Sequence, residues 1–217
     1  MSSGVFDERL IYPTAQRNGP PSRLDELFDA CEAANLAVGH CVTSQPNSGG
    51  WDYRTRLLAP AFTLALSLEP LVDGRHFFAA QIIQRSILER VGSLFCIHQS
   101  PDVYLPKWEK GWKHKGPDKR PEFLELIKMI PILSDTAENA EEFRIFIRNS
   151  ANRAVHSDPY SIVHLFLDTD DPNVKSVISG PLPEGHASIP HHEALIQIAL
   201  LSLLNAAEVA FPEIVKS

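Results

Sequence analysis

The stretch that decides the fold is residues 73 to 98, DGRHFFAAQIIQRSILERVGSLFCIH. We expect one long helix here, opened by Asp73 and ending near His98, because apolar residues recur at helical spacing. They form a wide stripe that is predicted to face the core: Phe77, Phe78, Ile82, Ile83, Ile87, Val91, Leu94 and Phe95. The opposite, polar face is predicted to carry Gln81, Gln84, Arg85, Glu89 and Arg90.

Two helices are expected upstream of this stretch. Ser22 precedes a charged turn and an apolar rhythm, so it is predicted to cap an amphipathic helix that ends near Gly39. Asp52 is predicted to cap a second helix that runs to about Leu68. Pro60 should kink that helix, because its ring removes one backbone donor and clashes with the preceding turn.

Downstream, the pattern changes from helical to extended. A short helix is expected from Pro121, and another from about Thr136 to just before Asp158. The runs SIVHLFLD (161–168) and VKSVIS (174–179) are β-branched and are separated by the turn sequence TDDPN. This pattern predicts a β-hairpin at about residues 161–180.

The last helix is expected to start around Pro190, with Ser188 as a candidate cap. It is apolar almost all round, so we expect it to be central. The sequence therefore predicts a mainly all-α fold, a bundle of about six to seven helices with a small β-hairpin inserted before the last helix. Residues 1–20 are expected to form a flexible N-terminal arm, and residues 21–217 a single helical-bundle domain.

The composition is that of an ordinary globular protein, and its charge is unevenly distributed. The 217 residues are 44% hydrophobic and carry a formal net charge of −7, which argues against a protein that coats nucleic acid non-specifically. A basic segment at residues 107–120 runs against this average, because it holds six basic and two acidic residues. Within it, Trp108 and Trp112 are four residues apart, a spacing that suits either base stacking or packing against the protein. Taken with one arginine further along the chain, the expected nucleic-acid-binding residues are Lys107, Trp108, Lys110, Trp112, Lys113, Lys115 and Arg153.

Other site classes have little support in the sequence. Three widely spaced cysteines suggest neither a disulfide framework nor a zinc site. The start, MSSGVFDERL, lacks the apolar run of an export signal, and the apolar stretch Ala194–Ala207 is expected to be too short to span a bilayer. We therefore expect a cytoplasmic protein with no membrane contact. No cofactor-binding motif is present, and adjacent residues of the group His186, His191, His192 and Glu193 should point apart, so no metal site is expected.

One candidate site lies in FIRNSANRAVHSDP (146–159), where Arg148, Asn152 and His156 fall at intervals of four and share a helical face. An arginine can hold a phosphate while a histidine exchanges a proton, which suffices in principle for metal-free RNA cleavage. The alternative is a polar helix face whose terminal histidine interacts favourably with the negative helix end.

A second candidate pair is Arg85 and Glu89, which can form an i,i+4 ion pair. In a functional interpretation, Glu89 orients His156 or Arg148 across a groove between helices. In a structural interpretation, the two residues form an exposed ion pair that contributes under about 1 kcal/mol.

The arrangement Arg85-Ser-Ile-Leu-Glu89, followed about sixty residues later by Asn152-Arg-Ala-Val-His156, resembles the HEPN superfamily and related bacterial helical families over residues 50–210. The resemblance implies a helical bundle that often dimerises. Many such proteins are metal-independent ribonucleases of toxin–antitoxin and phage-defence systems, and others bind partners or nucleotides without catalysis. In the active families, an Arg and a His with four to six residues between them supply the site.

This chain departs from that spacing, because seven residues separate Arg148 from His156 and two separate Arg153 from His156. Eight helical positions span roughly 12 Å, which is too far for one phosphate. Arg85 beside Glu89, Asn152 and His156 is therefore the more compact site.

The leading expectation is a HEPN-like protein that acts on single-stranded RNA, with His156 as acid and base. Arg85 or Arg148 would stabilise the phosphate, Glu89 and Asn152 would orient the site, and the basic segment would guide the substrate. The resemblance also implies a homodimer. Two alternatives stay open: a non-catalytic interaction module of a defence system that binds a protein partner, or a bundle that binds a nucleotide or an anionic small molecule.

Overall fold

The computed structural model describes residues 23–44, 52–113, 166–168, 175–177 and 180–212. This part of the chain is mainly helical, which confirms the predicted all-α class. Its helices are α1 (Arg23–Ser44), α2 (Tyr53–Leu66), α3 (Glu69–Asp73), α4 (Phe77–Gln99), α5 (Pro101–Lys113) and α9 (Ile189–Ala210). Two three-residue strands, β1 (Phe166–Asp168) and β2 (Lys175–Val177), pair antiparallel with Phe166 opposite Val177.

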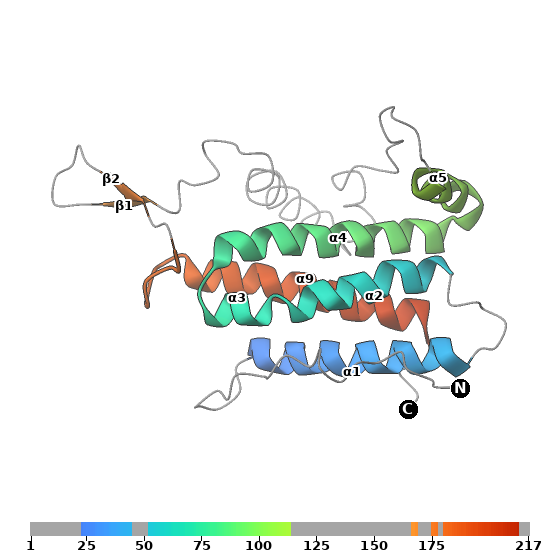
Figure 1. Ribbon diagram of the computed structural model, residues 1–217, viewed down its shortest axis with the longest axis horizontal. Coiled ribbons are helices and arrows are strands. Elements are labelled where there is room, and N and C mark those ends of the chain that lie inside the picture. Colours follow the sequence, from blue (N-terminus) through green and yellow to red (C-terminus); the bar gives the residue numbers. More distant parts are fainter. Residues whose placement is uncertain (1–22, 45–51, 114–165, 169–174, 178–179, 213–217) are drawn as a thin grey trace, which may run out of the picture.

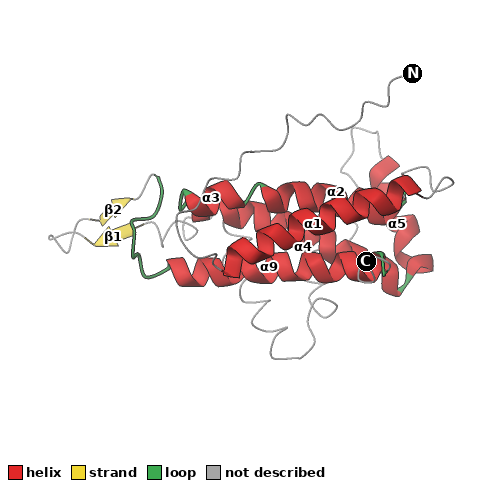
Figure 2. Cartoon of the chain, turned by 90° about the horizontal axis from the view of Figure 1, so that it is seen from below, coloured by secondary structure: helices red, strands yellow, loops and turns green. Residues whose placement is uncertain are grey.

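Four long helices form the bundle. Each of α1, α2, α4 and α9 packs against two neighbours, in the order α1, α2, α4, α9 and back to α1, and α2 also touches α9 across the middle. In Figure 1, α1, α4 and α9 run in one direction and α2 returns between them, while α5 turns across the end of α4. Figure 2 shows the same helices side by side from below. The strands β1 and β2 lie beyond the end of the bundle that is opposite to α5. The chain thus reaches α9 by a long crossover from α5, a connection known in other helical bundles.

The core fills the space between these four helices. Its largest fully buried side chains come from every wall of the bundle, because each helix buries one apolar face: Phe28 from α1, Leu58 and Phe62 from α2, Ile87, Leu94 and Ile97 from α4, and Ile196 from α9. Leu68 and Phe211 close the two ends of this core. Burial of one such side chain contributes about 1.5–3 kcal/mol, so this core is the main source of stability.

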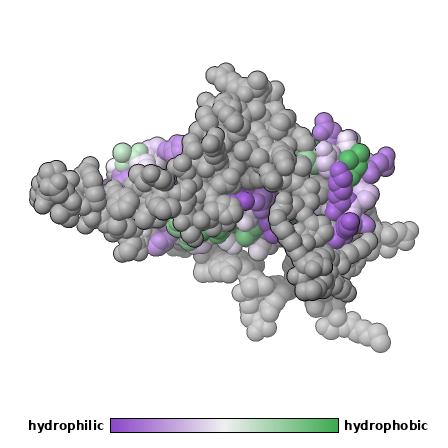
Figure 3. Space-filling view, turned by 90° about the horizontal axis from the view of Figure 1, so that it is seen from above, coloured by the Kyte–Doolittle hydropathy of each residue, from purple (hydrophilic) through white to green (hydrophobic). Residues whose placement is uncertain are grey.

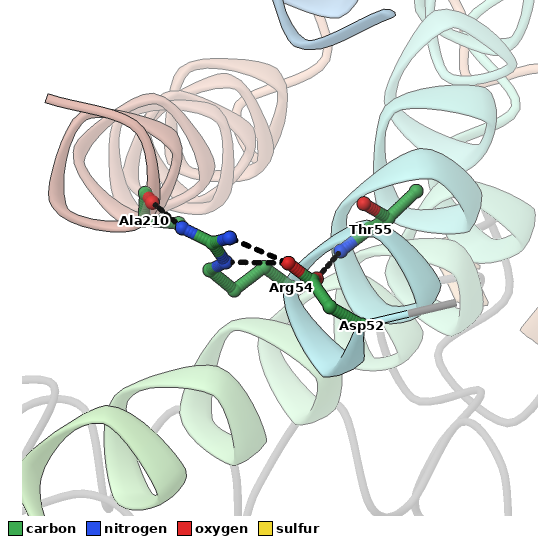
Figure 4. A network of polar contacts seen from close by, with 4 residues as sticks. All are labelled: Asp52, Arg54, Thr55 and Ala210. Atoms are coloured by element: carbon green, nitrogen blue, oxygen red, sulfur yellow. Dashed lines mark hydrogen bonds and ion pairs between the residues drawn. The ribbon is translucent and has the colours of Figure 1, made fainter. Parts of the chain in front are cut away.

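Asp52 caps α2 as predicted. Its Oδ1 accepts a hydrogen bond from the backbone N–H of Thr55 at 3.0 Å. The same carboxylate, through Oδ2, accepts two hydrogen bonds from Arg54, from Nε at 2.8 Å and from Nη2 at 2.6 Å. Arg54 in turn donates from Nη1 to the carbonyl of Ala210 at 2.9 Å, as Figure 4 shows. One arginine therefore ties the start of α2 to the end of α9.

The start of the long helix was predicted wrongly. Asp73 ends the short helix α3 instead of opening α4, which begins at Phe77. Between them, Arg75 has a φ of 56°, in the left-handed region, and this reverses the chain direction. Its Nε donates to the carbonyl of Leu182 at 2.8 Å, and its own carbonyl accepts from the N–H of Leu182 at 3.0 Å. The corner is thus anchored to the segment that leads into α9.

The polar face of α4 was also predicted wrongly in part. Gln81 and Gln84 were placed opposite the core, yet both are buried, while Ile82 from the predicted core stripe is 39% exposed. Apolar residues surround much of this helix, so their spacing alone does not decide which side of α4 faces the core. The packing of α4 against α2 and α9 decides it. The core face of α4 is therefore centred on Ala80, Gln84 and Ile87.

The start of α9 at Ile189 confirms the predicted start around Pro190, but three other features of the helices differ from the predictions. α1 continues past Gly39 to Ser44, and α5 forms over residues 101–113, where the sequence pattern predicted no helix. Ser188 precedes α9 without capping it, because its hydroxyl pairs with Nδ1 of His186 at 2.8 Å. α9 is not enclosed on all sides, since Leu201 is 44% exposed.

The apolar stretch Ala194–Ala207 is the middle part of a longer helix, α9. Among the described residues, Tyr53–Asp73 and Ile189–Ala210 are long and apolar enough to cross a membrane by length and composition. Each of them packs one side into the bundle core, as core helices of other helical proteins also do.

Part of the predicted architecture lies outside the described residues. This applies to the N-terminal arm, to the helices expected from Pro121 and Thr136, and to the turn 169–173. The count of six to seven helices and the complete hairpin at 161–180 therefore stay predictions.

Candidate functional site

The described part of the candidate site is the Arg85–Glu89 pair on α4. Arg85 Nε donates to Glu89 Oε1 at 3.0 Å, which confirms the i,i+4 ion pair expected from the sequence. The two side chains are unequally covered, because that of Arg85 is 18% exposed and that of Glu89 is 43% exposed. The pair is thus neither fully solvated nor part of the core.

The position of this pair follows from the rotation of α4. Ile87 lies on the opposite side of the helix from Arg85 and is fully buried in the core, whereas Leu88 and Cys96 lie on the same side as Arg85 and are also fully buried. The same side is lined by local hydrogen bonds, from Arg90 Nη1 to the carbonyl of Ser86 at 2.8 Å and from Ser93 Oγ to the carbonyl of Glu89 at 2.7 Å. The pair therefore lies on a largely covered side of α4, where Ser93 is buried.

The chemistry of the pair is that of an oriented cation. A guanidinium carries five N–H donors in a planar fork, and Glu89 takes the hydrogen bond from Nε. Such a fork matches the oxygens of a carboxylate or a phosphate. The neighbouring carboxylate reduces the net positive charge of the pair, so an anion is attracted less strongly here than by an arginine without an acidic neighbour.

The other predicted catalytic residues, Arg148, Asn152 and His156, lie outside the described residues, as does Arg153. Of the predicted catalytic set, Arg85 and Glu89 belong to the described residues, and the structure brings these two together. The compact arrangement with Asn152 and His156 stays a prediction.

The basic segment begins on α5, and part of it packs against the protein. Lys107 and Lys110 are exposed, whereas Trp108 is half-buried and packs against the core. The guanidinium carbon of Arg56 lies 5.9 Å from the centre of the Trp108 ring, and the Lys107 ammonium lies 5.4 Å from that of Tyr104. Among the described side chains, Trp108 is thus engaged within the bundle.

Figure 3 shows hydrophilic side chains next to a small hydrophobic area at the end of the molecule where α5 lies. The exposed residues of α5 include Val103 as well as the two lysines. Trp112 and Lys113 belong to the last turn of α5, with side chains outside the described part, and Lys115 lies beyond it. Arg56 was not predicted as part of this surface, since no spacing in the sequence connects it to Trp108.

The histidines near the start of α9 do not form a cluster. His191 is exposed while His192 is buried, and their ring centres are 6.0 Å apart. Among the described residues, no group of three or more His, Cys, Asp or Glu side chains could hold a metal ion.

Cys31 and Cys96 are buried and form no disulfide bond, and burial affects the protonation of both thiols. Burial raises the pKa of Cys31 to about 12 and also raises the pKa of Cys96. Both groups are therefore protonated near neutral pH, which makes them poor nucleophiles.

Comparison with family models, with curated proteins and with solved structures finds no match to this chain.

Proposed function

We propose that this protein acts on single-stranded RNA as a HEPN-like, metal-independent endoribonuclease. In this proposal the bundle has six to seven helices with a complete hairpin, and it works as a cytoplasmic homodimer in a toxin–antitoxin or phage-defence setting. The single observation that carries the proposal is the Arg85–Glu89 contact of 3.0 Å on α4. This contact supports the proposal because Arg85 and Glu89 belong to the motif that resembles the HEPN superfamily. The contact holds the Arg85 guanidinium in one orientation.

The proposed reaction is the attack of a ribose 2′-hydroxyl on the adjacent phosphate. His156 removes the proton from that hydroxyl, and the protonated imidazole then supplies a proton to the departing 5′-oxygen. Arg85 balances the charge that develops on the phosphate oxygens, a role for which its planar fork is suited. Glu89 and Asn152 hold these two groups in place, and Lys107 and Lys110 guide the RNA strand.

The test compares purified variants on mixed-sequence single-stranded RNA in the presence of EDTA. Arg85→Ala should lower the cleavage rate about 100-fold or more, the usual effect of removing one charge-stabilising donor. Arg90→Ala is the matched control, because Arg90 lies on the same helix and makes a local bond to Ser86 at 2.8 Å. Equal rates for wild type and Arg85→Ala would contradict the proposed role of Arg85.

A second candidate is a non-catalytic interaction module of the same kind of system. The packing of Trp108 against the core, with Arg56 near its ring at 5.9 Å, favours this candidate, since that tryptophan serves the fold. It would be preferred if the wild-type protein leaves RNA intact in EDTA and also fails to bind it.

A further inference from the structure

A polar contact lies inside the core between α4 and α9. The side-chain N–H of Gln81 and the Nδ1 atom of His192 are hydrogen-bonded at 3.1 Å, and the two residues are each 3% exposed. Phe77 stacks on the His192 ring, with ring centres 5.2 Å apart and planes inclined by 13°. The first turns of the two helices are thus joined by a buried hydrogen bond in an otherwise apolar region.

Two acceptors beside this contact are not satisfied by the protein. The Oε1 atoms of Gln81 and Gln84 are fully buried and accept no hydrogen bond within the described structure. Gln84 is 1% exposed, so bulk water does not reach it. A buried carbonyl oxygen without a donor is costly, and most such groups in proteins bind either a protein donor or an internal water.

Gln81 and Gln84 are three residues apart on α4. Residues three apart on a helix lie on the same face, with Cβ atoms about 5–6 Å apart. A water molecule carries two O–H groups, so one molecule between the two amides can donate to both. Proteins of this size commonly hold several such internal waters.

We propose that the core holds a small hydrogen-bond-donating ligand, an internal water, bound by the side-chain oxygens of Gln81 and Gln84 next to the Gln81–His192 contact. The assignment does not depend on which way the Gln81 amide is turned. With oxygen and nitrogen exchanged, Oε1 accepts from the His192 ring and the amide N–H faces the same position. A water accepts a hydrogen bond as readily as it donates one.

This site explains why a polar side chain such as Gln84 occupies the centre of the α4 core face. The internal water makes the contact between α4 and α9 hydrated at this point. Two helices with apolar side chains would exclude water from the same contact. The proposal concerns the core and stands independently of any action on RNA.

The direct test is a high-resolution crystal structure of the wild-type protein. A well-ordered water within hydrogen-bond distance of the Gln81 side-chain amide and of Gln84 Oε1 is the expected result. A dry site, with both amides bonded to protein donors, would overturn the proposal.

A solution experiment supplies the matched control. Magnetic relaxation dispersion of water nuclei counts long-lived internal waters in the full chain. Gln84→Met, which keeps the side-chain length and removes the acceptor, should lose one such water. Gln99→Met at the exposed end of the same helix should lose none. If Gln84→Met folds and retains as many long-lived internal waters as the wild-type protein, no water is bound at Gln84. If it does not fold, the wild-type crystal structure still decides the question.

Discussion

Arg54 is the side chain whose removal should most directly loosen the contact between α2 and α9. It makes two hydrogen bonds to Asp52 and one to the carbonyl of Ala210, at the negative end of α9 (Figure 4). Its guanidinium carbon also lies 4.7 Å from the centre of the Phe211 ring. Arg54→Ala removes all of these contacts at once, while the buried apolar residues of both helices stay in place.

The expected loss can be worked from these contacts. A hydrogen bond from a charged group contributes about 1.5–3 kcal/mol, and the lower end applies because the Arg54 side chain is 29% exposed. The ring contact adds about 0.5–1 kcal/mol and the ion pair with Asp52 adds about 0.5 kcal/mol. Because such terms are not fully additive, we expect a loss of about 2 kcal/mol in the free energy of unfolding, or roughly 4–8 °C in Tm.

Urea unfolding followed by circular dichroism measures this loss. Arg23→Ala, at an exposed position in the first turn of α1, is the control and should change stability by less than about 0.5 kcal/mol. Asp52→Ala should cost about 1 kcal/mol through the lost cap of α2. The double variant should lose less than the sum of the two single variants, because they remove a shared ion pair. An Arg54→Ala protein as stable as the control would refute the reasoning.

Two further predictions concern the α3–α4 corner and the buried thiol. Arg75→Ala and Arg75→Gly both lose the 2.8 Å hydrogen bond to the carbonyl of Leu182. The alanine variant must still adopt the strained φ of 56°, which glycine adopts without strain. The glycine variant should therefore be more stable than the alanine variant by about 1 kcal/mol in urea unfolding. Equal stabilities would show that the corner is not strained. Burial raises the pKa of Cys31 from 9.0 to about 12, so the folded protein holds this proton more tightly and its stability should fall as pH rises from 9 to 12. The slope approaches about 1.4 kcal/mol per pH unit. It should be shallower in Cys31→Ala, and an unchanged slope in that variant would contradict this cause.

The local features of the fold were predictable from the sequence. Asp52 stands before an apolar rhythm and caps α2 through the N–H of Thr55, as its side-chain chemistry favours. The pair Arg85 and Glu89 forms the ion pair that its spacing predicts. In both cases the interacting groups lie within one helical turn, so sequence spacing is enough.

The long-range features were not predictable. The burial of Gln81 depends on His192, which is 111 residues away, and the bridge from Arg54 to Ala210 spans 156 residues. No helical period indicates which residues of another helix will lie opposite. α5 was missed because Pro106 normally argues against a helix interior, whereas here the helix continues through it while its apolar side chains pack on the core.

We propose that the protein cleaves RNA without a metal, and the chemical form of the RNA fragments is the sharpest evidence for or against this reaction. Attack by the 2′-hydroxyl leaves a 2′,3′-cyclic phosphate on one fragment and a 5′-hydroxyl on the other. We predict both ends when wild-type protein is incubated with single-stranded RNA in EDTA, and their loss in His156→Ala. Intact RNA with the wild-type protein, or identical products from His156→Ala, would contradict the account.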